Sequence, residues 1–423
     1  MPRVALFTLG CRLNQAETEG MGEALESVGF DTVSFGEQAE LTLINTCTVT
    51  ASADASSRQA IFRAKRIWPE TRVVVTGCYA ETHRDALEAM PEVAGVIPNG
   101  KKEEILAELS ELFPEDILSG RFSVPIDFVS PNRTHTRAFV KIQNGCEDNC
   151  SYCVIPFSRG NDRSRSSEDV LAEILRLEKA GYKEVVLTGV HIGKYWDGKI
   201  RLDGLLRLIL ERTKIPRLRL SSIKVNEVNE KLLELFRSEE RICPHFHTPI
   251  QSGCDTVLER MKRRYRTAQV REVLAQLKEI RTDCTIGTDL IVGFPGETEE
   301  EFESGHDFIA SLPVDHMHVF PYSDRPGTAA SEMSNKIESA VKNERGEKLR
   351  KLSEKKWDAH ISRFVGRKLS VLFEGGRSRE FGVSAGTADN YIRVTVNADG
   401  ALANQLKTVR ILSVEGKSLR GEV

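Results

Sequence analysis

The sequence predicts an α/β protein with an N-terminal three-layer parallel domain, a larger parallel domain that forms an open barrel, and a small C-terminal all-β barrel. Apolar runs of strand length alternate with amphipathic, helix-length segments up to about residue 320, and this alternation is typical of parallel sheets. From residue 369 the helical period disappears, and strand-like runs lie between Gly and Asn/Asp turns. A chain of 423 residues is long enough for two or three domains with separate cores.

The composition is that of an ordinary soluble protein, with 40% hydrophobic and 29% charged residues. No apolar run reaches the ~18 residues of a membrane span, and the first residues lack a signal peptide's apolar region. A cytoplasmic location without a membrane partner is therefore predicted. The nine cysteines then favour metal binding or catalysis over disulfides. A net charge of −3 argues against a general nucleic-acid coat but is compatible with RNA binding through local basic patches.

The first domain, residues 1–125, is predicted to place one cysteine just after each of three parallel strands: Cys11, Cys47 and Cys78. Ligands of a parallel sheet lie beyond the carboxyl ends of its strands, so the three thiols would meet at one edge. A single buried cysteine is often a small packing residue, but three at one structural position predict a metal cluster. The predicted elements are strands at residues 4–9, 41–44 and 73–75 and helices at about 15–28 and 53–67.

The second domain, residues 129–365, repeats the strand–helix alternation on a larger scale. Six strands with intervening helices predict a partial (β/α)6 barrel, with its chemistry at the carboxyl ends of the strands. The predicted strands are residues 138–142, 184–187, 217–220, 245–248, 286–292 and 316–320. The predicted helices are residues 167–180, 202–213, 230–236, 267–279 and 299–310. The charged segment 336–364 is predicted as a helix that docks through a loose apolar stripe of Leu349, Leu352, Trp357, Ile361 and Phe364.

The last segment, residues 366–423, is predicted as a compact β-barrel. Its candidate strands are residues 369–373, 391–396 and 409–414. Barrels of this kind often bind oligonucleotides, but they also serve as structural caps, and composition favours neither role.

The most informative motif is the C-x3-C-x2-C run of Cys146, Cys150 and Cys153, which follows the first predicted barrel strand. Three thiolates at this spacing suit a four-iron cluster in which one iron has no protein ligand. A zinc site is the alternative, but zinc usually takes four ligands from paired C-x2-C units. No matching pair follows in this sequence, so an iron–sulfur cluster is predicted.

The cysteine run resembles that of radical S-adenosylmethionine (SAM) enzymes, and the whole chain resembles the methylthiotransferase family within them. The resemblance is best to the subfamily that acts on threonylcarbamoyladenosine in tRNA. It rests on Leu9-Gly-Cys-Arg-Leu-Asn-Gln-Ala-Glu17, Asn45-Thr-Cys-Thr-Val-Thr50 with Ser57-Arg-Gln59, Cys153-Val-Ile-Pro156, and His318-Val-Phe-Pro-Tyr-Ser323 with Arg325-Pro-Gly-Thr328.

The resemblance implies two 4Fe-4S clusters and SAM as cofactors. Cys146, Cys150 and Cys153 would hold the cluster that cleaves SAM, and Cys11, Cys47 and Cys78 an auxiliary cluster that carries or donates sulfur. The implied reaction adds a methylthio group at C2 of N6-threonylcarbamoyladenosine at position 37, in the tRNA anticodon stem-loop. The C-terminal barrel would be a TRAM domain, and the electron donor a flavodoxin or ferredoxin.

Weaker signals lie at predicted strand ends. The family pattern implies that Thr188, Gly189 and Asp289 contact SAM, with turn chemistry or strand packing as the alternative. His247 and Gln251 also lie at a strand end, where a structural histidine is favoured over a catalytic one.

Further polar residues follow the cysteine loop. Arg159, Arg163 and Arg165 would grip phosphate or the SAM carboxylate, unless they belong to a solvated loop. Relatives often have Glu-Pro after a Ser-Ser-Ile step, whereas this chain has Lys224-Val225, so the SAM contact of that Glu is not carried over. Three other cysteines match no ligand spacing and are interpreted as packing residues: Cys243, Cys254 and Cys284.

Two groups of alternatives accompany this interpretation. Sister subfamilies act on isopentenyladenosine in tRNA or on an aspartate of a ribosomal protein. Outside the family, a two-cluster electron carrier or an RNA-binding iron–sulfur sensor would also contain two cysteine sets. An electron carrier, however, needs neither a barrel of this size nor an open iron site.

Overall fold

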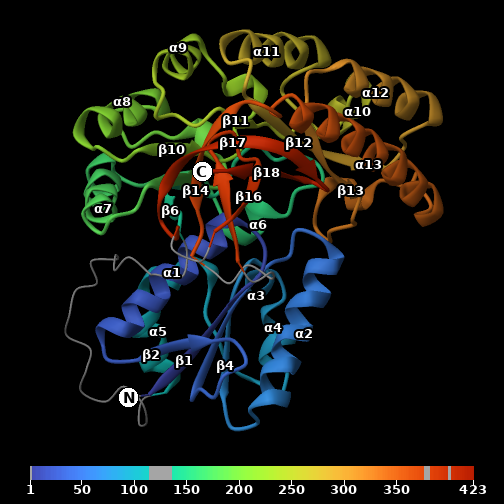
Figure 1. Ribbon diagram of the computed structural model, residues 1–423. Helices are drawn as coiled ribbons and strands as arrows, with labels where there is room; N and C mark the ends of the chain where they lie inside the picture. The colour runs from blue at the N-terminus through green and yellow to red at the C-terminus, as the bar shows by residue number, and fades with distance from the viewer. Residues whose placement is uncertain (1, 114–135, 376–381, 399–401) are drawn as a thin grey trace. The chain divides into compact units, whose positions relative to one another are not determined.

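The computed structural model describes all residues except 1, 114–135, 376–381 and 399–401, and divides the chain into two compact units (Figure 1). The cysteine unit comprises Met1–Asn132, Asn144–Arg163 and Ser323–Ser331. The barrel unit comprises Arg133–Gln143, Ser164–Tyr322 and Glu332–Val423. The predicted boundary between residues 125 and 129 lies outside the described residues. No helix in the described part of the chain is long and apolar enough to cross a membrane.

The cysteine unit contains a five-stranded, all-parallel sheet in the order β2-β1-β3-β4-β5, with helices on both faces. The predicted three-layer architecture is thus confirmed. The strands are β1 (Arg3–Thr8), β2 (Asp31–Ser34), β3 (Leu41–Thr46), β4 (Arg72–Gly77) and β5 (Val93–Val96). The helices are α1 (Arg12–Ser27), α2 (Ala51–Ile67), α3 (Cys78–Thr82), α4 (Arg84–Glu88), η1 (Asn99–Glu104) and α5 (Ile105–Leu112).

Central strand β3 is buried along its whole length, because α1 and α5 pack on one face of the sheet and α2 with α3 on the other. Strands β2 and β5 were not predicted. They are edge strands of four residues each with exposed positions, and such segments lack a continuous apolar run.

All six predicted strands of the barrel unit are present and parallel, but they form two three-stranded sheets, β10-β9-β6 and β11-β12-β13. An isolated bridge pairs Leu218 of β10 with Ile242, three residues before β11, and Ile223 N, after β10, donates to His247 O at 3.0 Å. Between these two contacts the pairing is interrupted, because Pro244 has no N–H to donate and the next amide, of His245, donates back to Cys243 O. The strands are β6 (Ala138–Lys141), β9 (Glu184–Thr188), β10 (Arg217–Leu220), β11 (His245–His247), β12 (Thr285–Val292) and β13 (His316–Pro321).

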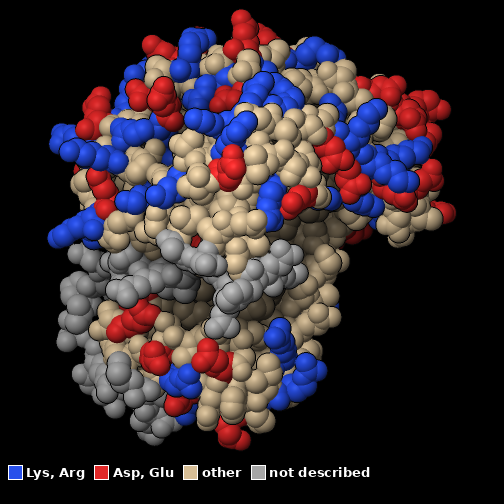
Figure 2. All heavy atoms as spheres, viewed as in Figure 1, with Lys and Arg blue, Asp and Glu red and all other residues tan. Residues whose placement is uncertain are grey.

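The helices of the barrel unit follow the prediction closely. They are α7 (Ser167–Lys179), η2 (Ile192–Lys194), α8 (Leu202–Arg212), η3 (Val225–Glu227), α9 (Glu230–Ser238), α10 (Asp255–Arg260), α11 (Thr267–Ile280) and α12 (Glu299–Ser311). Short strands β7 (Gln143–Asn144) and β8 (Arg163–Ser164) flank the cysteine loop, and η4 (Ala329–Glu332) follows β13. On the visible face of this unit, basic and acidic side chains are interspersed, without a large patch of one sign (Figure 2).

The C-terminal segment forms a closed five-stranded barrel in the order β14-β15-β16-β18-β17. Its strands are β14 (Lys368–Phe373), β15 (Val383–Ala388), β16 (Arg393–Asn397), β17 (Leu406–Glu415) and β18 (Ser418–Glu422). The predicted docking helix is α13 (Ser339–Ser362). Ile361 and Phe364, at its end, join the apolar core of the barrel, while Leu349 is buried nearer its start.

Three buried charged residues fasten this barrel to the sheet of the same unit. The Arg219 side chain is fully buried; its Nε lies 2.6 Å from Glu184 Oε1, and its Nη1 donates to Asp389 O at 2.9 Å. Arg217 donates to Thr387 O at 3.1 Å and lies 3.3 Å from the Glu184 carboxylate. The barrel is therefore joined to the sheet through ionic side chains that water does not reach.

Candidate functional site

The three N-terminal cysteines lie at the carboxyl edge of the parallel sheet, one after each of three neighbouring strands. Cys11 precedes the first residue of α1, Cys47 comes directly after β3, and Cys78 is the first residue of α3. Cys47 and Cys78 are buried and Cys11 is exposed. The order of the strands, β1-β3-β4, brings the three segments side by side.

Two glycines allow this close approach. Gly10 has φ +93°, and a Cβ there would lie 2.7 Å from Cys47 Cβ and 2.8 Å from Cys47 Sγ. Gly77 has φ +102°, and a Cβ there would lie 2.4 Å from Thr46 O. A side chain at either position would thus push apart the loops that carry the thiols.

The donor set fits an iron–sulfur cluster. Burial raises the pKa of the Cys47 thiol to about 11; the backbone N–H of Val49 opposes the shift, and the neighbouring Cys78 and Cys11 thiols add to it. A buried thiol that resists ionisation by itself binds as a thiolate when a metal supplies the compensating positive charge. Cys11, Cys47 and Cys78 would hold three irons of such a cluster.

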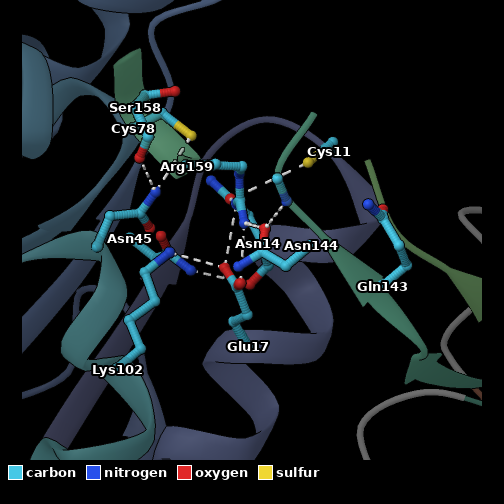
Figure 3. Close-up of polar contacts among 12 residues, drawn as sticks. Cys11, Asn14, Glu17, Asn45, Cys78, Lys102, Gln143, Asn144, Ser158 and Arg159 are labelled. Atoms are coloured by element: carbon cyan, nitrogen blue, oxygen red, sulfur yellow. Dashed lines mark hydrogen bonds and ion pairs between the residues drawn. The ribbon is translucent and has the colours of Figure 1, made fainter. Parts of the chain in front are cut away.

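Two asparagines lie against these cysteines (Figure 3). Asn14 Oδ1 is 4.0 Å from Cys11 Sγ, and its Nδ2 donates to Leu9 O at 2.8 Å and Thr46 O at 2.9 Å. Asn99 Nδ2 lies 3.8 Å from Cys78 Sγ and donates to Ser158 O at 2.6 Å. The sequence did not predict a role for Asn99, because it lies in η1, 21 residues after Cys78, and belongs to no motif.

The surroundings of Arg159 differ from those predicted from the sequence, which were an open site for phosphate or the SAM carboxylate. Its guanidinium does not face an open anion site, because it donates to Glu17 Oε1 at 2.9 Å, Asn14 Oδ1 at 2.5 Å and Asn144 Oδ1 at 2.9 Å. Lys102 Nζ lies 2.7 Å from Glu17 Oε2. The side chains of Arg159, Glu17 and Lys102 are only 1%, 2% and 3% exposed. The predicted grip on phosphate or on the SAM carboxylate is therefore wrong for Arg159.

The other two arginines of that group differ from each other. Arg165 donates to Lys141 O at 2.9 Å and pairs with Glu173 at 2.5 Å, so it is structural. Arg163 is exposed, and its guanidinium lies 3.5 Å from Arg159 O. Arg163 thus fits the solvated-loop alternative.

The C-x3-C-x2-C segment forms a closed loop that ends in α6 (Ile155–Arg159). Cys146 N donates to Gly160 O, and Cys153 N donates to Cys150 O, both at 3.0 Å. Gly145 has φ +75°, and a Cβ there would lie 1.9 Å from Asn161 O, so the neck of the loop is very narrow. Cys146 is buried and the other two cysteines are half-buried, which suits a cluster with one iron open to a ligand.

A second segment, Ser323–Ser331, also belongs to the cysteine unit. Buried Arg325 lies 2.6 Å from Asp54 Oδ2 and donates to Thr48 O at 3.2 Å, next to Cys47. Ala330 N donates to Ser151 O at 2.7 Å, inside the C-x3-C-x2-C loop. The segment Ser323–Ser331, which contains the Arg-Pro-Gly-Thr motif, thus connects the surroundings of both cysteine sets.

The tentative SAM residues lie in the barrel unit. Thr188, the last residue of β9, is buried and accepts from Ile142 N at 2.9 Å. A Cβ on Gly189 would lie 2.7 Å from Gln143 O, so close packing alone requires this glycine.

Asp289, in β12, lies between two histidines of neighbouring strands. Its Oδ1 is 3.3 Å from His247 Nε2 and 3.1 Å from His318 Nδ1. Burial would raise the pKa of the Asp289 carboxyl, but these two histidines outweigh it and hold the pKa below its usual range. Ser222 Oγ lies 2.8 Å from His247 Nδ1. Gln251 pairs with β12 through its backbone and has φ +72°.

Lys224 stands where relatives often have Glu, and the carboxylate of Glu227 lies close to it. Lys224 N donates to Glu227 Oε2 at 3.3 Å, and the same carboxylate pairs with buried His191. A Cβ on Gly193 would lie 2.1 Å from Glu227 Oε2. A carboxylate, that of Glu227, thus lies three residues after position 224 and contacts both Lys224 N and His191, which the sequence motif did not indicate.

The cysteines interpreted as packing residues include two that are buried in the barrel unit, Cys243 and Cys284. Burial raises the pKa of the Cys243 thiol to about 12 and also raises that of the Cys284 thiol. Both remain neutral at physiological pH. Cys254 is half-buried, with its Sγ 3.2 Å from Thr256 Oγ1.

Comparison with known proteins agrees with this architecture. A profile of the radical SAM superfamily matches residues 140–309, and a profile described as uncharacterized protein family UPF0004 matches residues 3–98. TsrM, a radical SAM methyltransferase from Kitasatospora setae, has a TM-score of 0.59 and 18% identity over 78% of this chain and 77% of its own, which shows a shared fold. The fold and the cysteine loop thus define a radical SAM protein.

Two curated relatives are more specific. A threonylcarbamoyladenosine tRNA methylthiotransferase of Aquifex aeolicus is 39% identical, over 88% of this chain and 92% of its own length. The protein of the same description from Bacillus subtilis is 36% identical, over 97% of this chain and 94% of its own length. The chain belongs to the radical SAM tRNA methylthiotransferase family.

The crowding at Gly10 leads to a prediction about cluster assembly. Gly10→Ala should lower the iron and sulfide bound by Cys11, Cys47 and Cys78, because the new methyl group meets Cys47 and the left-handed backbone adds ~1–2 kcal/mol of strain. Iron and acid-labile sulfide are measured after anaerobic reconstitution. Gly36→Ala is the matched control, since Gly36 has φ +108° with nothing within 4 Å of its Cβ position. Equal iron loss in both variants would assign the effect to backbone strain alone.

Proposed function

We propose that this protein is a radical SAM methylthiotransferase that adds a methylthio group at C2 of N6-threonylcarbamoyladenosine, at position 37 beside the tRNA anticodon. One observation carries the proposal: both three-cysteine sets belong to one compact unit, in which two segments connect their surroundings. A sulfur-insertion reaction needs such an arrangement, because the sulfur source must meet an activated substrate before water does.

Each three-cysteine set would hold a cluster with its own role. Cys146, Cys150 and Cys153 would hold the cluster that binds SAM, and Cys11, Cys47 and Cys78 would hold the auxiliary 4Fe-4S cluster. Bound there, the first cluster and SAM supply the radical chemistry that an unactivated aromatic C–H bond requires. The closed loop from Gly145 to Gly160 would fix the three thiolates, and the half-buried Cys150 and Cys153 would leave the open iron accessible.

SAM would lie at the carboxyl ends of the barrel strands, where Thr188, Gly189 and Asp289 remain the proposed contacts. Asp289 suits this role because its carboxylate is kept ionised by the flanking His247 and His318. A flavodoxin or ferredoxin would supply the electron. The tRNA anticodon stem-loop would be the macromolecular partner, in the cytoplasm.

Substrate identity has a direct test. Three anticodon-loop RNAs that carry threonylcarbamoyladenosine, isopentenyladenosine or plain adenosine at the target position are incubated with reconstituted, reduced protein and SAM. The expected preference for the threonylcarbamoyl substrate is about 10⁴-fold, because a site that hydrogen-bonds a polar group leaves its own atoms unpaired with a substrate that lacks it. Methylthio products are quantified by mass spectrometry of the nucleosides.

Other outcomes of this assay are equally informative. Equal turnover of the isopentenyl substrate would move the protein to the sister subfamily. Modification of a ribosomal protein but of no RNA would remove it from tRNA chemistry. If SAM were not cleaved at all, the protein would be an electron carrier or an RNA-binding iron–sulfur protein.

A further inference from the structure

We propose that Arg159, acting with Lys102 and Glu17, is a positioning residue that sets the reduction potential of the auxiliary cluster. This inference rests on the proposed function, since it takes Cys11, Cys47 and Cys78 as cluster ligands. The buried charge of Arg159 would favour the reduced, more negative state of that cluster and raise its potential.

One residue, Asn14, lies between the Arg159 guanidinium and the Cys11 thiol. Its Nη2 donates to Asn14 Oδ1 at 2.5 Å, and the same oxygen lies 4.0 Å from Cys11 Sγ. Asn14 is itself fixed by donation from its Nδ2 to Leu9 O and Thr46 O, the residues that precede the first two cysteine loops. Figure 3 shows these side chains converging between Cys11 and Cys78. The guanidinium is therefore linked to the loop of Cys11 through Asn14.

Helix α6, which carries Arg159, also contacts the surroundings of Cys78. Ser158, next to Arg159 in α6, accepts from Asn99 Nδ2 at 2.6 Å, and Asn99 Nδ2 lies 3.8 Å from Cys78 Sγ. Since α6 directly follows the C-x3-C-x2-C loop, two adjacent residues of that helix contact the neighbours of both Cys11 and Cys78. The environment of the auxiliary cluster thus depends on a segment outside the N-terminal fold.

Arg159 supplies the positive charge of this network. Its guanidinium holds the Glu17 carboxylate at two points, 2.9 Å and 3.1 Å, whereas burial lowers the pKa of Lys102 below its usual range. A four-iron core with two positive charges and three thiolates carries one net negative charge, which the Arg159 guanidinium complements. Because all three side chains are at least nine-tenths buried, their field is weakly screened and acts strongly on the cluster.

The test is a redox titration of full-length protein in which Cys146, Cys150 and Cys153 are all replaced by Ala, so that only the auxiliary site can hold a cluster. Arg159→Met removes a positive charge and should lower the reduced-to-oxidised ratio at fixed potential about tenfold, or ~59 mV for a one-electron couple. Glu17→Gln removes a negative charge and should shift the potential in the opposite direction. Arg159→Lys keeps the charge and should stay near the parent value.

A structural role would give a different pattern. Arg159→Met and Glu17→Gln break the same ion pair, so loosening of the fold alone would shift both potentials in the same direction. Arg345→Met is the matched control, because Arg345 also forms a buried pair, with Glu297 in the barrel unit, and it should leave the potential unchanged. Shifts of one sign for the two test variants, or no shift at full iron content, would overturn the proposal.

The titration also separates this inference from the function on which it rests. The titration needs neither tRNA nor SAM turnover. An unchanged potential in Arg159→Met would therefore reject this inference and leave the proposed methylthiolation standing. If the triple-alanine parent bound no iron, the auxiliary cluster itself, and with it the inference, would be rejected. If Arg159→Met failed to load a cluster, Glu17→Gln would be the test: a higher potential would support the proposal, and a lower or unchanged potential would overturn it.

Discussion

Replacement of Cys146 by Ala is expected to abolish cleavage of SAM, whereas replacement of Cys47 by Ala should spare cleavage and abolish methylthiolation. The reason is that the two cysteine sets come from separate loops, one closed at its neck by Gly145 and one spread over three strand ends. Loss of one thiolate from the closed loop removes a ligand of the iron cluster that would activate SAM. The readouts are 5′-deoxyadenosine and methylthio nucleoside from anaerobically reconstituted, reduced protein.

The same pattern is expected for the other members of each set: Cys150 and Cys153 with Cys146, and Cys11 and Cys78 with Cys47. Cys284→Ala is the control, because Cys284 is a buried thiol of the barrel unit that remains neutral. It should retain both activities. A Cys47→Ala protein that still formed methylthio product at the wild-type rate would deprive the auxiliary cluster of its proposed role.

Much of the site was predictable because its signals are local. Each N-terminal cysteine follows an apolar strand, and the parallel order of β1, β3 and β4 places the three at one edge. The six barrel strands were all predicted, because buried parallel strands are short apolar runs between helices with a clear amphipathic period. The glycines before Cys11 and Cys78 were visible in sequence, although only the structure shows which atoms they make room for.

The parts that were missed depend on contacts between distant residues. β15 contains Ser, Ala and Gly and has little strand propensity of its own, so it forms because the closing barrel pairs both of its edges. Arg159 was interpreted as an anion ligand because nothing local indicates Glu17, 142 residues earlier in the chain. Glu227 likewise reaches His191 from a separate 3₁₀ turn. Burial of a charged residue by a distant partner has no periodic signature in the sequence.

The second large effect is expected at the junction between the C-terminal barrel and the sheet. Glu184→Gln should destabilise the barrel unit by ~3–5 kcal/mol, because it leaves Arg217 and Arg219 buried beside an uncharged amide. In the native structure the Glu184 side chain is fully buried and its carboxylate contacts both arginines, at 2.6 Å and 3.3 Å. The measurement is the unfolding midpoint in denaturant, followed by the signal of the native tryptophans. Glu168→Gln is a control, since its pair with Lys199 is exposed and should contribute little.

Deletion of residues 369–423 should destabilise the same unit, because the carbonyl groups of Thr387, Ala388 and Asp389 that accept from the two arginines would be lost. Weaker tRNA binding by such a deletion would therefore not by itself identify an RNA-binding surface. Replacing Glu184 by Leu and both arginines by Met should recover part of the stability lost in Glu184→Gln, since apolar residues of similar volume avoid the cost of burying ions. If Glu184→Gln and the deletion both unfolded at the wild-type midpoint, the barrel would be an independent appendage, and the buried ionic contacts would contribute nothing to its attachment.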